Sequence, residues 1–257
     1  MLVLLSPAKT LDYHSEVPAL PLTDPRFMSE SAALIRELRE LSPSQLSELM
    51  SISTKLADLN AQRYQDWRRT PAEACTRAAI LAFAGDVYDG LQAATFTAAD
   101  HDYAQQHLRI LSGLYGVLRP LDRLQAYRLE MGTRLATKKG STLYDFWGDQ
   151  LAQSLMTELK NHALHPEPVV INLASQEYSK AALTPALTAR VISPAFLDEK
   201  NGKYRTVGLF AKKARGQMAA WIVRERVAVP EKIKEFTGGG YAYSEAHSDG
   251  DTWAFIR

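Results

Sequence analysis

The stretch Leu111–Arg134, LSGLYGVLRPLDRLQAYRLEMGTR, combines residue types that neither a simple helix nor a simple strand carries together. Its apolar residues recur at helical spacing and are predicted to face a core: Leu111, Leu114, Val117 and Leu118. Two glycines interrupt that pattern. Arg119-Pro120 ends it, because the residue before a proline is disfavoured in the helical region. The stretch must therefore be held in place by its surroundings.

Arginines follow this irregular backbone, and only two acids, Asp122 and Glu130, offset them. A rigid irregular segment that carries arginine is a common way for proteins to hold anionic groups. We therefore predict phosphate contacts at Arg119, Arg128 and Arg134. The alternative is that these arginines are solvated or paired with the two acids.

Other short polar or basic segments lie at expected turns and strand ends. They are SPAKTLD (Ser6–Asp12), GDVYDGL (Gly85–Leu91), NLAS (Asn172–Ser175), FLDEKNGK (Phe196–Lys203) and AKKARG (Ala211–Gly216). Together with LSGLYGVLRPLD and YRLEMG they resemble, in order and over nearly the whole chain, the YaaA family of bacterial peroxide-stress proteins. The resemblance implies resistance to hydrogen peroxide, lower free intracellular iron and less oxidative DNA damage. It also implies DNA binding by a mixed fold with a positively charged cleft and a helix-hairpin-helix element.

Length and composition are those of an ordinary soluble protein. The chain has 257 residues, of which 46% are hydrophobic and 23% are charged, and its net charge is +1. That charge does not by itself indicate a nucleic-acid binder, so any such activity must come from an uneven charge distribution. The apolar start, MLVLL, lacks a basic lead-in, which favours a buried strand over a signal peptide. With a single cysteine, these features predict a cytoplasmic protein.

Hydrophobic periodicity predicts strands and helices that alternate along the whole chain. Strands are expected at 2–5, 77–83, 169–173, 190–196 and 204–210, with a hairpin over 241–257. Helices are expected at 34–41, 44–50, 55–67, 97–107, 142–159 and 211–227, and 86–91 as a turn or short helix. We therefore predict one α+β (mixed α/β) domain over residues 1–257, with a mixed sheet, surrounding helices and a helix-hairpin-helix-like lobe at 43–69.

That lobe contains LMSISTKLA, Leu49–Ala57, which resembles the helix-hairpin-helix pattern Leu-x-Gly-Ile-Gly-x-Lys-x-Ala. In that motif the hairpin amides and the following helix N-terminus hold a DNA phosphate, helped by the lysine. Ser51 and Ser53 replace the two glycines that allow close backbone approach, although serine is also small and adds a donor. We expect phosphate contacts from Ser51, Ser53, Lys55 and Arg63. The alternative is a helix pair that serves packing alone.

A third basic stretch, 203–234, has nine Lys and Arg residues and only two acids. Lys212, Lys213 and Arg215 crowd the first turns of a predicted helix, where cations are unfavourable because a helix N-terminus is already positive. This placement predicts a bound anion, and the alternative is a solvated run of charge. We expect the following residues to share one concave surface: Lys9, Arg128, Arg134, Lys212, Lys213 and Arg215.

DNA, contacted mainly through its phosphates, is the partner that these features predict. No membrane segment and no protein partner can be identified. The alternative function is an enzyme that acts on a nucleotide or on a base in DNA. In that case Glu130 or Glu177, each expected near arginine, would serve as acid or base.

Neither a metal site nor a cofactor is expected. His101 and His107 are six residues apart, which does not place them on one helix face, and His162 and His165 lie just before a proline. Cys75 has no resolving partner, so we expect a small buried hydrophobic residue rather than a redox sensor.

Overall fold

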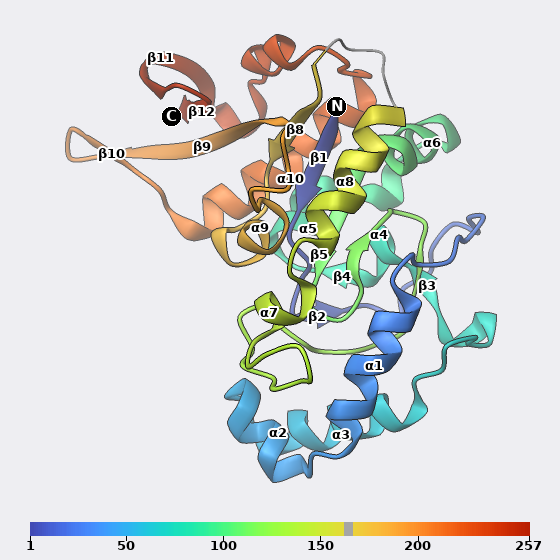
Figure 1. The fold of residues 1–257 in the computed structure, drawn as a ribbon. Coiled ribbons are helices and arrows are strands. Elements are labelled where there is room, and N and C mark those ends of the chain that lie inside the picture. Colours follow the sequence, from blue (N-terminus) through green and yellow to red (C-terminus); the bar gives the residue numbers. More distant parts are fainter. Residues whose placement is uncertain (162–166) are drawn as a thin grey trace.

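Leu2–Leu5 forms β1, a strand whose four residues are all buried, at the centre of the molecule (Figure 1). This computed structural model describes residues 1–161 and 167–257. β1 pairs in parallel on both sides, with Leu4 opposite Arg109 on one neighbour and opposite Asn172 on the other. A strand buried on both faces needs a continuous apolar run, which explains LVLL.

Among the described residues, the sheet around β1 has eight strands. Their spatial order is β11 (Ala242–Asp249), β12 (Thr252–Ile256), β9 (Arg190–Lys200), β8 (Val169–Asn172), β1, β5 (Leu108–Ser112) and β6 (Gly116–Leu118), with β10 (Lys203–Arg205) paired to β9. Five strands run parallel, from β12 to β5, and β6, β10 and β11 are antiparallel to their partners. The sheet is therefore mixed, as predicted.

Helices cover both faces of this sheet, with α8 in front and α10 behind in Figure 1. The α-helices are α1 (Met28–Arg39), α2 (Pro43–Met50), α3 (Thr54–Asp66), α4 (Ala79–Ala82), α5 (Asp86–Leu91), α6 (Ala98–His107), α7 (Leu143–Trp147), α8 (Gln150–Asn161), α9 (Gln176–Ala182) and α10 (Gly208–Arg224). Short 3-10 helices occur at Glu73–Cys75, Ala93–Thr95, Pro230–Glu235 and Gly238–Gly240. Two further strand pairs are β2 (Thr10–Leu11) with β4 (Phe83–Ala84) and β3 (Arg77–Ala78) with β7 (Arg123–Leu124).

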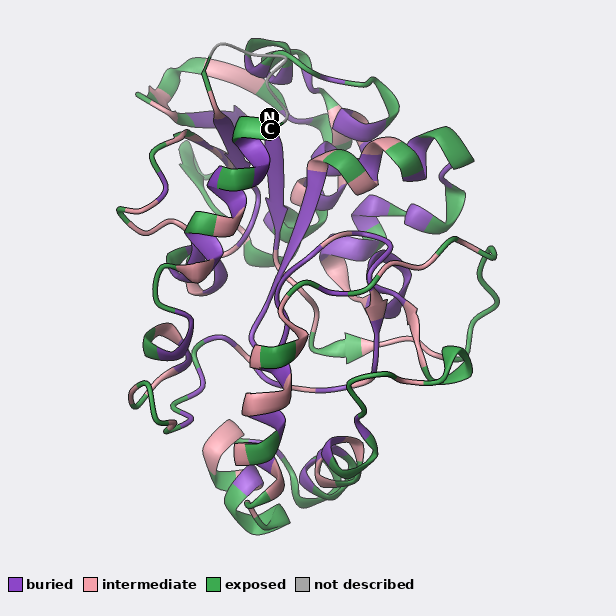
Figure 2. Ribbon diagram, turned by 45° about the vertical axis from the view of Figure 1, so that its right-hand side comes forward, coloured by how far each residue is buried: buried purple, intermediate pink, exposed green. Residues whose placement is uncertain are grey.

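Helices α1, α2 and α3 form a lobe at the opposite end of the molecule from the chain termini (Figure 1). The central strands β1, β5, β6 and β8 are almost entirely buried, whereas β10, β11 and much of the outer side of this lobe are exposed (Figure 2). One hydrophobic cluster runs from the strands into the lobe through Leu34, Leu46 and Tyr64. The chain is thus a single α+β domain, and the predicted lobe is part of it.

The central stretch begins with a hairpin of two strands. Its apolar residues are buried, but Leu111 and Val117 are partners in an antiparallel hairpin between β5 and β6. Gly116, the first residue of β6 after the turn at 113–115, has φ +68°. Gly113 lies so close to the carbonyl of Leu129 that a Cβ there would stand 2.3 Å from the oxygen. The prediction that these residues face a core is confirmed, although their helical spacing comes from two strands and a turn.

Three other predicted elements were wrong in part. Residues 77–83 form β3, α4 and the start of β4 instead of one strand. The helix predicted over 142–159 is broken at Gly148, whose φ of +48° ends α7 before α8 begins. The strand predicted over 204–210 ends at Arg205, and α10 begins at Gly208.

Candidate functional site

Two neighbouring parallel strands, β1 and β8, end in polar loops that contact each other. Ser6 follows β1, and its hydroxyl oxygen accepts a hydrogen bond of 2.8 Å from the backbone N–H of Ser175, which follows β8. The hydroxyl of Tyr88 on α5 donates to the carbonyl of Ser6 at 3.0 Å. The carboxyl ends of parallel strands are where ligands commonly bind in α/β sheets.

Lys9, three residues further along the first loop, meets the central stretch at Glu130. The Lys9 ammonium lies 2.7 Å from one oxygen of the Glu130 carboxylate, and the Arg128 guanidinium lies 2.9 Å from the other. The Lys9 side chain is 64% exposed, whereas that of Arg128 is 17% exposed. Arg128 Nε is buried with no hydrogen-bond partner. Two cations thus contact the single carboxylate of Glu130.

Glu177 lies beside this cluster but is tied to the backbone. One of its carboxylate oxygens accepts a hydrogen bond of 2.9 Å from the N–H of Gly132. Burial raises the pKa of the neighbouring Tyr178, and the charges of Glu177 and Glu130 raise it further, so its hydroxyl stays neutral. Tyr178, Lys9 and Arg128 line a cavity of only about 10 Å³, the space of a single water molecule. A larger anion would therefore contact the outer edge of this cluster.

The basic turns of α10 approach the same region through α5. Lys212 lies 3.8 Å from the Asp86 carboxylate at the start of α5, and Gly85, just before it, lies against Ala8. Lys213 is exposed. Arg215 is partly buried, and that burial lowers the pKa of its guanidinium. Among the described residues, neither Lys213 nor Arg215 makes a side-chain hydrogen bond or ion pair.

The third predicted site lies in the lobe, where three residues join α2 to α3. Ser51 adopts the left-handed conformation, with φ 51° and ψ 51°, and Ser53 caps α3 by accepting a hydrogen bond from the N–H of Leu56. Ile52 between them is buried, and its carbonyl accepts a 2.6 Å hydrogen bond from the hydroxyl of Ser47. The two serines are exposed, and packing and hydrogen bonds fix the backbone conformation of the connection.

Lys55 is exposed in the first turn of α3, which contains no acid. The N–H groups of Thr54 and Lys55 belong to the helix start, where amides have no partner within the helix. Arg63 instead faces inward: it donates to the Asn60 amide oxygen at 3.4 Å, and burial lowers its pKa. Two leucines of α3, Leu56 and Leu59, are exposed at 37% and 44%.

The predicted basic residues fall into separate groups. Lys9 and Arg128 meet directly, and Lys212 reaches the same neighbourhood through Asp86. Arg119 is held by the buried carboxylate of Asp122 and by the carbonyl of Asp24, which makes it part of the framework. Arg134 is exposed and, among the described residues, has no side-chain hydrogen bond or ion pair.

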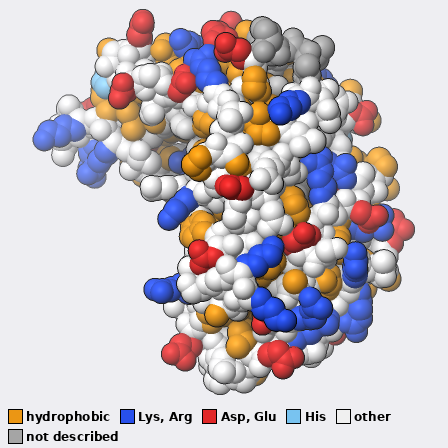
Figure 3. Space-filling view, in the orientation of Figure 1, with side chains coloured by type: hydrophobic (Ala, Val, Ile, Leu, Met, Phe, Trp, Pro, Cys, Tyr) orange, Lys and Arg blue, Asp and Glu red, His pale blue; other side chains and the backbone are white. Residues whose placement is uncertain are grey.

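One bond links the lobe to the central cluster: the Tyr64 hydroxyl on α3 donates to the carbonyl of Arg128. Figure 3 shows a hollow on the left side of the molecule, between the β9–β10 hairpin and the lower part of the domain, with Lys or Arg side chains at its edge. Whether all six residues expected on one concave surface share this hollow stays a prediction.

Sequence reasoning did not identify Tyr178 as a member of the cluster, although the polar segment ASQEY (Ala174–Tyr178) at a strand end was the available signal. It also misplaced Cys75, which is exposed on a short 3-10 helix rather than buried.

Within residues 1–161 and 167–257, no group of three or more His, Cys, Asp or Glu side chains could hold a metal ion. His162 and His165, which were not expected to form a metal site, lie outside the described residues. None of the helices described is long and apolar enough to span a lipid bilayer.

Comparison with known proteins identifies what this chain is similar to. Residues 1–247 match the family model described as peroxide stress protein YaaA. A UPF0246 protein of Verminephrobacter eiseniae (strain EF01-2) is 53% identical over 260 aligned positions, which cover 100% of this chain and 98% of that relative. The match extends over the strand ends, the central stretch and the lobe alike. The chain therefore belongs to the YaaA family of peroxide stress proteins.

Proposed function

We propose that this protein acts in the peroxide stress response by binding DNA, mainly through its phosphates, and thereby protects DNA from oxidative damage. The observation that carries the proposal is the exposed connection Ser51–Ser53 at the start of α3. It brings together small residues, the unpaired N–H groups at the start of α3 and an exposed lysine in one fixed conformation. Such an arrangement is suited to one phosphate group, because the amides and the helix dipole both favour negative charge.

Phosphate contacts of this kind provide affinity without sequence selectivity. The net charge of +1 means that the whole molecule has little general attraction for DNA. Binding must therefore come from local groups: the helix-hairpin-helix-like connection, the Lys9–Arg128 cluster and the basic turns of α10. A protein of this kind would act in the cytoplasm, where bacterial DNA lies. We propose that lower free iron is an indirect effect of its activity.

Replacement of Lys55 tests the proposal. Lys55→Ala should weaken binding to all duplex sequences alike and lower the slope of log affinity against log salt by about one unit, because one phosphate contact is lost. The fold should be unchanged, since Lys55 is exposed. Titration of one labelled duplex at two salt concentrations measures both quantities.

Lys160→Ala is the matched control, because Lys160 is also exposed and lies at the end of α8, on another part of the molecule. Ser51→Gly and Ser53→Gly should preserve or strengthen binding, since glycine permits closer backbone approach. If the affinity and salt slope of Lys55→Ala equal those of the control, the connection serves packing alone.

A second candidate function is supported by the position of Glu130. Its carboxylate lies between Lys9 and Arg128, beside the carboxyl ends of two parallel strands and close to the neutral hydroxyl of Tyr178. A carboxylate in such a place can act as acid or base towards a nucleotide or an extruded base. This enzyme would use the same DNA-binding surface.

A further inference from the structure

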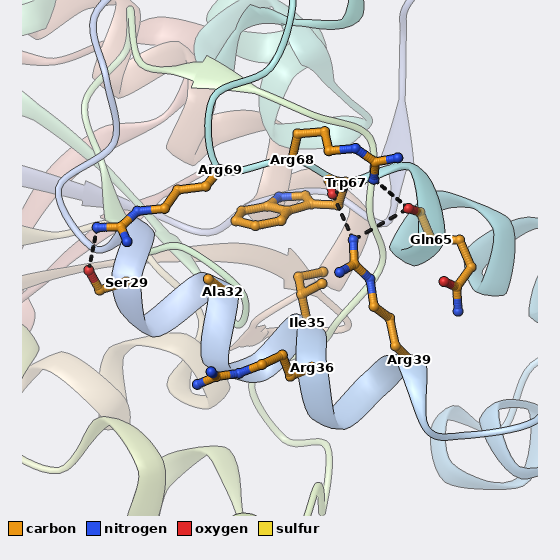
Figure 4. Close-up of a pocket in the computed structure, with 9 residues that line it drawn as sticks. All are labelled: Ser29, Ala32, Ile35, Arg36, Arg39, Gln65, Trp67, Arg68 and Arg69. Atoms are coloured by element: carbon orange, nitrogen blue, oxygen red, sulfur yellow. Dashed lines mark hydrogen bonds between the residues drawn. The ribbon is translucent and has the colours of Figure 1, made fainter.

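A groove of about 730 Å³ lies between α1 and the segment that follows α3 (Figure 4). It is separate from the Lys9–Arg128 cluster and from the Ser51–Ser53 connection. Ala32, Ile35 and Trp67 form its apolar floor. Its other lining residues are Ser29, Gln65 and four arginines, Arg36, Arg39, Arg68 and Arg69, which we call the arginine groove.

The positive charges of the lobe are concentrated in the groove, and its negative charges lie elsewhere. Residues 28–69 contain six Lys and Arg and six Asp and Glu, so the lobe has no net charge. Four of the six cations line the groove and none of the six acids does. Figure 3 shows Lys and Arg side chains gathered over α1, where this groove lies. The groove is therefore a local concentration of positive charge on a lobe that is neutral as a whole.

Two of the guanidinium groups are held close together by the backbone. Arg39 Nη2 donates to the carbonyls of Gln65 at 3.3 Å and Trp67 at 2.7 Å, and Arg68 Nη1 donates to the same two oxygens. Arg39 Nε also donates to the carbonyl of Tyr64 at 2.8 Å. These carbonyls at the end of α3 carry only partial negative charge. Two full positive charges are thus fixed beside each other without a carboxylate.

The other two arginines keep most of their donors free. A guanidinium has five N–H donors, and Arg69 uses one of its nitrogens in a 3.0 Å bond to the Ser29 hydroxyl. Among the described residues, Arg36 makes no side-chain hydrogen bond or ion pair. Figure 4 shows Arg36 and Arg69 at one end of the floor and Arg39 and Arg68 at the other. Guanidinium donors that no carboxylate occupies match the oxygens of phosphate groups, and the groove lining contains no acid.

We infer that the arginine groove is a second contact for the phosphate backbone of duplex DNA, an inference that rests on the proposed function. The groove lies at the C-terminal end of α3 and the Ser51–Ser53 connection at its N-terminal end. A helix of 13 residues is about 20 Å long. The two sites are therefore separated by less than one helical turn of duplex DNA, which is about 34 Å long, so a 16-base-pair duplex is long enough to contact both.

The test is the double variant Arg36→Gln/Arg69→Gln, compared with wild type and with Lys160→Gln/Lys232→Gln. Both doubles remove two exposed cations, and the control pair makes no side-chain hydrogen bond or ion pair in the described residues. Arg39 is left intact because it holds the end of α3. Fluorescence anisotropy with a 16-base-pair duplex at 50 and 200 mM salt gives affinity and salt slope. Titration calorimetry with inorganic pyrophosphate tests a small ligand of the same chemistry.

If the groove binds two backbone phosphates, its double variant should lose roughly tenfold or more in affinity at 50 mM salt, and its salt slope should fall by about 1.8. Raising the salt concentration fourfold should then lower the duplex affinity of the wild type about tenfold more than that of the variant. The control pair should behave like wild type.

Wild type that binds no duplex overturns the proposed function and this inference together. If the wild type binds the duplex and the groove variant has the same affinity and salt slope as the control pair, the inference alone is overturned. Pyrophosphate binding that disappears in the groove variant, with duplex affinity unchanged, assigns the groove to a small phosphate ligand and also overturns the DNA contact.

Discussion

Gly216 holds α10 against α5, and its replacement by alanine should destabilise the protein. A Cβ at Gly216 would lie 1.8 Å from the carbonyl oxygen of Val87 and 2.8 Å from the N–H nitrogen of Leu91. Both atoms belong to the backbone of α5, so no side-chain rotation can relieve the clash. The helices would have to separate by roughly 1.5 Å to restore ordinary van der Waals contact.

Two effects of Gly216→Ala oppose each other. Alanine favours a helix interior over glycine by about 1 kcal/mol. Overpacking of a close contact costs about 1–3 kcal/mol, and a clash between two backbones lies at the upper end of that range. The net loss should be about 1–2 kcal/mol, which corresponds to a fall in Tm of roughly 2–8 °C for a chain of this size.

Gly208→Ala is the matched control, because Gly208 is also in α10 and a Cβ there meets no atom within 4 Å. Differential scanning calorimetry of both variants should show a lower Tm for Gly216→Ala and an unchanged or higher Tm for Gly208→Ala. A Gly216→Ala protein at least as stable as wild type would refute the close crossing of α5 and α10. It would also remove the explanation for the position of Lys212 near Asp86, which depends on the close packing of α10 against α5.

Two further variants test the buried ion pair and the second candidate function. Burial alone would raise the pKa of Glu158, but hydrogen bonds from Arg109 and Arg26 outweigh it and hold the pKa below 4.5. The stabilisation from this group is present above the ordinary carboxyl pKa and is lost as pH falls through the lowered value. Glu158→Gln should therefore lower the free energy of unfolding by about 3–5 kcal/mol at pH 7. It should also flatten the acid side of a plot of Tm against pH, and an unchanged acid side would contradict this. Glu130→Gln should abolish any turnover of a defined DNA lesion without lowering duplex affinity, because it removes a negative charge beside Lys9 and Arg128. Turnover equal to wild type would remove Glu130 from catalysis.

Local sequence patterns determined much of the fold. The continuous apolar run Leu2–Leu5 identified the central strand, and Thr97 identified the start of α6, where it caps the helix with Asp100. The polar turn near Gly250 identified the C-terminal hairpin. Each of these features depends on a few neighbouring residues, because capping, turn geometry and burial of a short strand are local requirements. Membership of the family was also evident from short motifs.

Only the tertiary structure decided which distant residues meet. Helical spacing around Leu114 came from a hairpin, because periodicity over a few residues does not distinguish a helix from two short strands joined by a tight turn. The Lys9–Glu130 pair joins residues far apart in sequence, since the strand before Lys9 is placed beside the central stretch by sheet pairing. Arg36 and Arg69 line one groove because α1 packs near the end of α3. Sequence spacing contains no information about such contacts, which follow from the packing of the whole chain.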